Sequence, residues 1–219
     1  MGKHYESAPI PSEMRRNFDV YERINEKNIS LGTFESEVVS LTDAGIARVV
    51  IHESGLVYMS GIPGGSQSMT DDEELVKHGT KAAESSADSM IRLLHWALSC
   101  GGEGDLNDVL YTVKALGMVV SPGGGKSGSA PQVTNGFSFR WHTIFGGPKG
   151  DYAKNGIDPG GFSGIHARSA IGGFDGYFSV EPEMIVAIPS SLASEIISHR
   201  GWLFPLTPEI LDKVKASRR

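Results

Sequence analysis

The chain has 219 residues, of which 39% are hydrophobic and 21% are charged, a balance typical of a globular protein with one core. Its formal net charge of −6 argues against a nucleic-acid backbone as the main partner, because phosphate binding requires clustered lysine and arginine. The single cysteine, Cys100, excludes an intrachain disulfide and fits a reducing compartment. The sequence has no apolar run of about 18 residues and no signal-peptide core at its start, so we expect a cytoplasmic protein without membrane contact.

Residues 1–44 are expected to form an N-terminal extension of the main domain. A stripe of apolar residues predicts a short helix over about residues 13–27, with Ser12 as its N-cap. A weak alternation of apolar and polar residues over 30–42 predicts an added strand. We expect the helix to pack on the body of the protein or on a neighbouring subunit.

Two strands and a long helix are predicted next. Residues 46–52 and 56–60 are rich in β-branched and apolar side chains, which favours a pair of core strands. Thr70 begins a capping-box pattern and predicts the start of a helix. Apolar residues at helical spacing extend this helix to about Ser99, with an interruption near Gly79 left open.

A third strand and a second helix are predicted in the Gly-rich middle of the chain. Residues 108–120 predict a long strand, and residues 137–145 predict a short helix. The segments 121–136 and 146–164 are expected to be enlarged loops, because their glycine content relaxes the backbone. The helical spacing of Trp141 predicts a core position, and Trp141 also remains a candidate for lining a substrate site.

The closing part of the domain predicts a β-hairpin. Two short apolar runs, 166–171 and 179–188, flank a Gly-rich turn. Residues 190–219 are expected to be an extension that carries a helix over 208–219. Over residues 45–189 the order is therefore ββαβαββ, which predicts an α+β fold with a single mixed sheet and two helices on one face.

Charged residues lie inside the two closing strands, where a plain hairpin would not require them. Arg168 lies in the first strand, and Glu181 and Glu183 lie in the second, two residues apart and so on one face. They could form surface pairs worth well under about 1 kcal/mol. They could instead line a cleft, with arginine binding a substrate carboxylate and glutamate handling water.

Residues 167–171 read ARSAI, residues 180–187 read VEPEMIVA, and residues 55–63 read GLVYMSGIP. These three motifs resemble segments of the RidA family of enamine/imine deaminases. They are similar to the family's A-R-S-x-V strand, its V-E-x-E-x-I-A strand and its G-x-h-h-h-S-G-Q-I-P segment, the last without the glutamine. The resemblance covers roughly residues 45–189 and implies a homotrimer with clefts between subunits.

The resemblance also implies an activity, the hydrolytic deamination of a small carboxylate-bearing enamine or imine. In this reading Arg168 binds the carboxylate and Glu181 activates water, with Glu183 as the alternative carboxylate. The rest of the substrate would contact residues near the ends of two strands, with His166 able to assist proton transfer. These substrate-binding candidates are Ser60, Gly61, Ile62, His166, Ser169, Ala170 and Glu183.

Other features set the remaining expectations. None of the seven histidines has the spacing to another that zinc or iron sites use, so we expect neither a metal nor another cofactor. The enlarged loops suggest a substrate bulkier than 2-aminoacrylate, and an aminomuconate-like intermediate of aromatic degradation is one candidate. The alternative function is a non-catalytic trimer that binds a keto or amino acid and regulates another process.

Overall fold

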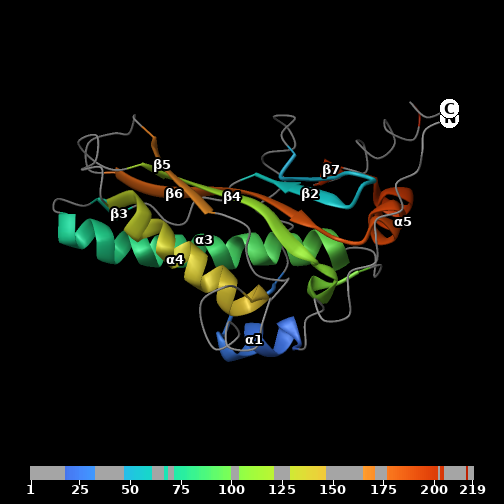
Figure 1. Ribbon diagram of the computed structural model, residues 1–219, viewed down its shortest axis with the longest axis horizontal. Coiled ribbons are helices and arrows are strands. Elements are labelled where there is room, and N and C mark those ends of the chain that lie inside the picture. The colour runs from blue at the N-terminus through green and yellow to red at the C-terminus, as the bar shows by residue number, and fades with distance from the viewer. Residues whose placement is uncertain are drawn as a thin grey trace.

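A seven-stranded mixed sheet covered on one side by helices forms the body of the protein (Figure 1). The computed structural model describes residues 18–32, 47–60, 67–68, 72–99, 104–120, 129–146, 165–170, 177–201, 203–204 and 216. The strands are β1 (Val49–Ile51), β2 (Leu56–Met59), β3 (Gln67–Ser68), β4 (Tyr111–Val120), β5 (Ile165–Ala170), β6 (Tyr177–Ala187) and β7 (Leu203–Phe204). Their order across the sheet is β5-β4-β6-β2-β1-β7, and β3 pairs with β6 outside this path.

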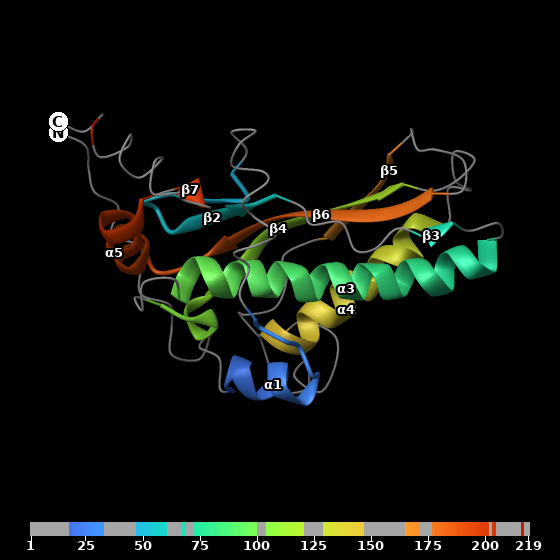
Figure 2. The ribbon, with the colours of Figure 1, turned by 180° about the vertical axis from the view of Figure 1, so that it is seen from behind.

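Two long helices, α3 (Asp72–Ser99) and α4 (Ser129–Phe145), form the layer beneath the sheet (Figures 1 and 2). The short helix α1 (Val20–Glu26) lies beyond α4, and α5 (Ser190–Arg200) lies at the end of the sheet near β7. A 3₁₀ turn, η2 (Leu106–Asp108), leads into β4. The predicted fold class, α+β with two helices on one face of a mixed sheet, is confirmed.

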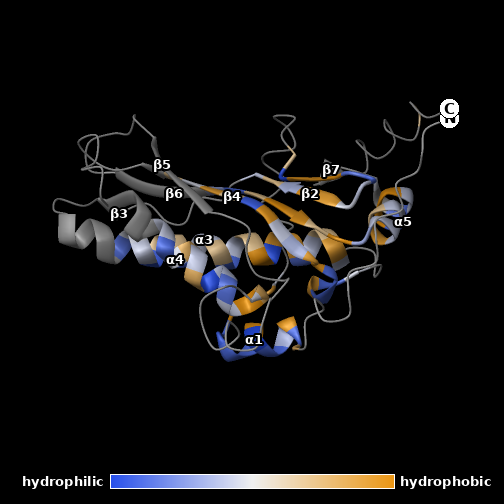
Figure 3. Ribbon diagram, in the orientation of Figure 1, coloured by the Kyte–Doolittle hydropathy of each residue, from blue (hydrophilic) through white to orange (hydrophobic). Residues whose placement is uncertain are grey.

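The core lies between the sheet and the two long helices. Figure 3 shows hydrophobic residues recurring along α3 and along the strands above it. Alternate strand residues such as Val57, Met59 and Met184 are fully buried on the side of the helices. Trp141 of α4 is also fully buried, and its indole N–H donates a 2.9 Å hydrogen bond to the hydroxyl of Thr112 on β4. The core position predicted for Trp141 is therefore confirmed.

The two long helices approach each other closely and are joined by an ion pair. Arg140 of α4 donates from Nε and Nη2 to the two carboxylate oxygens of Asp88 on α3, at 2.7 and 2.9 Å. Gly136 lies against the backbone of Thr80, where a Cβ atom would overlap the carbonyl oxygen. A bidentate ion pair therefore links the two helices. They can approach closely at Gly136 because this residue has no side chain.

The predicted closing hairpin is wrong, because β4 lies between its two strands. β5 pairs with β4 in parallel, and β6 pairs with β4 on the other side in antiparallel orientation. Parallel neighbours require a crossover connection, and α4 supplies it between β4 and β5. Including the two-residue β3, the order from β1 to β6 is β1-β2-β3-α3-β4-α4-β5-β6.

Several predicted boundaries also differ from the observed ones. The first helix begins after Asp19, whose side chain accepts a hydrogen bond from the Tyr21 amide, rather than near residue 13. The helix predicted at 137–145 begins at Ser129, so the second part of the expected loop 121–136 is helical. α3 continues through Gly79 without interruption.

The elements α5, β7, the two-residue β3 and the 3₁₀ turn η2 were not predicted, and three predictions cannot be fully compared with the structure. Helix α5 was missed because its sequence, SSLASEIISHR, has no side-chain N-cap and a weak amphipathic pattern, and β7 has only two residues. The cap at Ser12 lies outside the described residues, and so does most of the strand at 30–42 and of the helix at 208–219. No helix within the described residues is both long and apolar enough to cross a membrane.

Candidate functional site

The face of the sheet opposite the helices carries the charged residues of the closing strands. Met118 of β4 pairs with Arg168 of β5 on one side and with Glu181 of β6 on the other. Directly paired residues of neighbouring strands share a face, so the register assigns these three positions to one row across the sheet. Strands lie about 4.8 Å apart, which separates the Arg168 and Glu181 backbones by roughly 10 Å.

A second row of the same face lies two residues along the strands. Leu116 of β4 pairs with His166 of β5 and with Glu183 of β6. Since strand residues alternate between faces, this row lies on the same side as the first. The expectation that Glu181 and Glu183 share one face is confirmed by this register.

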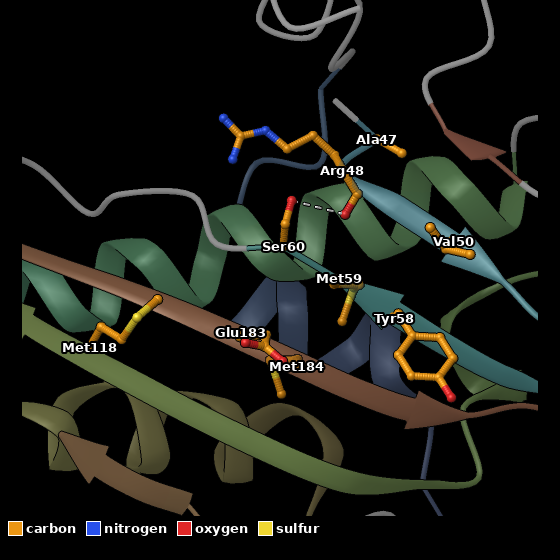
Figure 4. A pocket seen from close by; sticks show the side chains of 9 residues that line it. All are labelled: Ala47, Arg48, Val50, Tyr58, Met59, Ser60, Met118, Glu183 and Met184. Atoms are coloured by element: carbon orange, nitrogen blue, oxygen red, sulfur yellow. Dashed lines mark hydrogen bonds between the residues drawn. The ribbon is translucent and has the colours of Figure 1, made fainter. Parts of the chain in front are cut away.

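A pocket of about 320 Å³ opens on this face, next to the two rows (Figure 4). It spans four strands, from Arg48 just before β1 to Met118 on β4, with Ser60 and Glu183 between them. The residues that line it are Ala47, Arg48, Val50, Tyr58, Met59, Ser60, Met118, Glu183 and Met184. The pocket therefore reaches the residue that pairs with both Arg168 and Glu181.

Polar groups at the two sides of this pocket are fixed by the sheet. The carbonyl oxygen of Arg48 accepts hydrogen bonds from the Ser60 amide at 2.9 Å and from the Ser60 hydroxyl at 3.4 Å. These bonds continue the pairing of β1 with β2 by one residue beyond Val49 and Met59. Glu183 lies 3.7 Å from the ammonium group of Lys114 on β4, and both side chains are nearly half exposed. The wall of the pocket thus combines an arginine, a carboxylate and a hydroxyl above an apolar floor.

The predicted site residues separate into three groups in the structure. Ser60 and Glu183 line the pocket. The strand positions of Arg168, Glu181 and His166 belong to the open face of the sheet. Ser169 pairs with Val119 and takes the opposite face from Arg168, because neighbouring strand residues alternate.

Of the other four predicted site residues, Trp141 lies elsewhere, and the other three cannot be compared with the pocket. Ala170 ends β5 opposite Val120. Trp141 is fully buried beneath the sheet and is not among the residues that line the pocket, so its place in the structure is in the core. Gly61 and Ile62 lie outside the described residues.

Of the nine residues that line the pocket, Ser60 and Glu183 were predicted, and Arg48, Tyr58 and Met118 are among the seven that were not. The alternation of the strands carried the signal, because Arg48 is two residues before Val50, and Tyr58 is two before Ser60. Both residues therefore occupy strand positions that face away from the helices. Tyr58 is 41% exposed, which is high for an aromatic side chain in the middle of a sheet.

A second pair of titratable residues, Tyr21 of α1 and His95 of α3, lies away from this face and connects α1 to the core. The Tyr21 hydroxyl is 3.2 Å from Nδ1 of His95 on α3 and accepts a hydrogen bond from the Leu106 amide at 3.3 Å. Burial raises the pKa of Tyr21 and lowers the pKa of His95. Among the described residues, no three histidine, cysteine, aspartate or glutamate side chains gather as a metal site would require.

Comparison with known proteins supports the fold. The structure matches a crystal structure of a protein of unknown function from Agrobacterium tumefaciens with a TM-score of 0.54 and 22% identity, over 78% of this chain and 92% of that one. A second match, to a proposed endoribonuclease from Shewanella oneidensis MR-1, has a TM-score of 0.49 and 13% identity, over 76% of this chain and 99% of that one. At 22% identity the first match shows a shared fold and no more.

Two further comparisons gave no match. No protein-family model matches the sequence, and no curated protein matches it either. The arrangement of strands and side chains must therefore carry the functional argument.

Proposed function

We propose that this protein is a member of the RidA family and a hydrolytic deaminase of small enamines or imines that carry a carboxylate. The observation that carries the proposal is the register of the neighbouring strands β5, β4 and β6. It puts Arg168 and Glu181 on either side of Met118, in one row of the open face. The pocket beside this row has an apolar floor and a few polar groups, which is the usual composition of a small-molecule site.

Arg168 is the proposed carboxylate anchor. A guanidinium group is planar and always charged, and it binds a carboxylate through two parallel hydrogen bonds. The backbone separation of roughly 10 Å between Arg168 and Glu181 leaves room for a molecule of three to six carbons above Met118. A substrate held at one end by Arg168 would therefore present its C–N bond toward β6.

Glu181 is the proposed general base. Protonation of the enamine carbon gives the imine, and water then adds to the imine carbon while the carboxylate takes a proton from that water. The protonated carboxylate then returns this proton to the nitrogen of the carbinolamine. The C–N bond breaks to release ammonia while the hydroxyl proton passes to solvent, which leaves a keto acid. Glu181 shares its row with Arg168. Glu183 lies one row away, and its side chain forms an ion pair with Lys114.

The same face supports assembly into a homotrimer. Val50, Tyr58 and Ile185 occupy the open side of the sheet and leave apolar surface only partly covered. A sheet face with partly exposed apolar residues is stabilised when another layer covers them, and a second copy of the chain would supply that layer. In this arrangement the substrate lies in clefts between subunits.

Replacing Arg168 with lysine tests the proposal. The variant keeps the positive charge but loses the forked geometry, so we expect keto-acid binding and turnover to fall by about tenfold or more. An enamine generated in situ is the substrate, and ammonia release above the rate in buffer alone is the readout. Unchanged turnover in a normally folded variant would remove Arg168 as the anchor. Keto-acid binding without any turnover by the wild type would instead favour a binding protein.

A further inference from the structure

Tyr58 presents an aromatic ring to the pocket beside the proposed deaminase site. It lies in β2, between β1 and β6, and it is 41% exposed. Figure 4 shows its ring beside Val50, with one face of the ring turned toward the viewer. Large apolar side chains that stay exposed on a sheet mark contacts with a ligand or a partner, and a ring that lines a pocket points to a ligand.

The pocket has apolar side chains at both ends and polar ones between them. Met118 lies at one end, Tyr58 and Val50 lie at the other, and Glu183 and Ser60 lie between them (Figure 4). The register gives the same order, because the strand partners of Met118 and Tyr58 lie on β6 on either side of Glu183. A ligand that extends from one end to the other therefore meets apolar surface at both.

The volume of the pocket leaves room for a ring in addition to a small imino acid. About 320 Å³ is the space of roughly ten water molecules in the liquid. A three-carbon enamine such as 2-aminoacrylate has about six non-hydrogen atoms and would occupy a minor part of this space. A phenyl group doubles the number of atoms and would rest on the apolar end of the pocket.

The charges along the pocket disfavour a second carboxylate on the ligand. Glu183 is nearly half exposed in the middle of the pocket, 3.7 Å from the ammonium group of Lys114. A ligand carboxylate that passed over Glu183 would be repelled, whereas a neutral ring would not. Arg48, the cation at the β1 edge, already has an interaction within the chain, so we assign it no contact with the ligand.

We propose that Tyr58 stacks on an aromatic ring of the ligand, so that the substrate of this site is a 2-imino acid, or its enamine, with one carboxylate and an aromatic side chain. This inference rests on the proposed function, in which Arg168 holds the carboxylate and Glu181 activates water. Water replaces the imine nitrogen, so ammonia leaves and an aromatic 2-keto acid remains. Tyr58 is then a specificity-determining residue, which contacts the substrate away from the reacting carbon.

The spacing along β6 agrees with a ligand of this shape. Glu181 and Ile185, the residue that pairs with Tyr58, are four residues apart, which is roughly 13 Å along the strand. A glutamate side chain reaches about 4 Å from the backbone, and the reacting carbon of a 3-phenyl imino acid lies about 4 Å from the centre of its ring. Packed aromatic rings have their centres about 4.5 to 7 Å apart. Together these lengths cover the distance between the two residues.

Matched keto acids test the inference, since each is the product of one candidate substrate. Phenylpyruvate carries the aromatic ring, 2-oxobutyrate carries a methyl group in its place, and 2-oxoadipate carries a second carboxylate. Calorimetry would measure the affinity for each acid. We expect the wild type to bind phenylpyruvate about tenfold or more tightly than either of the others.

Three variants locate this preference at Tyr58. Tyr58→Leu keeps an apolar side chain but removes the ring, so the preference for phenylpyruvate over 2-oxobutyrate should fall by about three- to tenfold. Tyr58→Phe keeps the ring and should retain the preference within about twofold. Tyr111→Leu is the matched control, because Tyr111 is 45% exposed on β4 and is not among the residues that line the pocket. This control should bind all three acids as the wild type does.

The outcomes separate this inference from the proposed function. A wild type that binds 2-oxobutyrate or 2-oxoadipate as tightly as phenylpyruvate would overturn the inference without any variant, and would leave the deaminase proposal standing. An undiminished preference in Tyr58→Leu, a lost one in Tyr58→Phe, or an equal loss in Tyr111→Leu would also overturn it. Binding that is unaffected by Arg168→Lys would instead overturn the anchor on which both proposals rest. A wild type that binds none of the three acids would contradict both.

Discussion

Gly136→Ala should destabilise the protein although alanine favours helices. In an exposed helix the exchange would stabilise by about 1 kcal/mol. Here the new Cβ would overlap the carbonyl oxygen of Thr80 and lie 2.9 Å from its Cγ2, and the carbonyl cannot move unless α3 moves. Overpacking of this kind costs about 1 to 3 kcal/mol. The clash involves backbone, so we take the upper part of that range and expect a net loss of about 1 to 2 kcal/mol.

Thermal unfolding is the assay for this prediction. For a chain of this size the loss corresponds to a fall in Tm of roughly 2 to 8 °C. Asn135→Ala is the matched control, because Asn135 is the preceding residue of α4 and is exposed, so this variant should gain a few tenths of a kcal/mol. A Tm that rises equally in both variants would refute the close approach of α3 and α4.

Two other predictions concern pH and assembly. Burial lowers the pKa of His95, so its neutral form contributes stability that is present above about pH 6.5 and is lost as the pH falls through the lowered value. His95→Gln should therefore lose less stability than the wild type between pH 7.5 and 5.5 in urea unfolding, and an equal loss would contradict the assignment. Light scattering should return three times the chain mass of 23.4 kDa, and a monomer would remove the clefts between subunits.

Local sequence patterns were sufficient to predict which strand residues share a face. Glu181 and Glu183 are two residues apart in one strand, so alternation predicts a shared face. The observed register assigns both of them, and Arg168 of β5, to the open side of the sheet. Helical and strand periods also located the long helix α3 and the strands β4 and β6, because each period depends on residues within one element, whereas the two-residue β3 and helix α5 were missed. The fold class followed from the order of the predicted elements.

Strand pairing could not be read from the same patterns. Whether the strand at 165–170 pairs with the next strand or with β4 depends on the crossover through α4, and periodicity within either strand does not contain that choice. The start of α4 at Ser129 was missed for a related reason. Its first residues include a proline and a glycine, which predict a loop, but packing of α4 against α3 outweighs this local preference.

The pocket shows the same limit. Arg48 precedes a strand of three residues, and the bonds from Ser60 continue the pairing of β1 with β2 by one residue to Arg48, which lines the same pocket as Glu183. The sequence held the alternation that assigns Arg48 to this face. It did not show how far β1 and β2 remain paired, which is a property of two segments together.

The most direct test of the account is the turnover of Glu181→Gln beside Glu183→Gln. Glutamine keeps the size and most hydrogen bonding of glutamate but cannot act as a base. We expect Glu181→Gln to lower turnover by about 10²- to 10⁴-fold, with keto-acid affinity near that of the wild type. Glu183→Gln should lower turnover much less, because Glu183 lies one row away and its side chain forms an ion pair with Lys114.

Ammonia or keto-acid release from an enamine generated in situ, measured against the buffer rate, gives the comparison. A slow Glu181→Gln protein beside a faster Glu183→Gln protein is the predicted result. A slow Glu183→Gln protein beside a fast Glu181→Gln protein would move the base by one row of the sheet. Two variants as fast as the wild type would contradict the carboxylate mechanism itself.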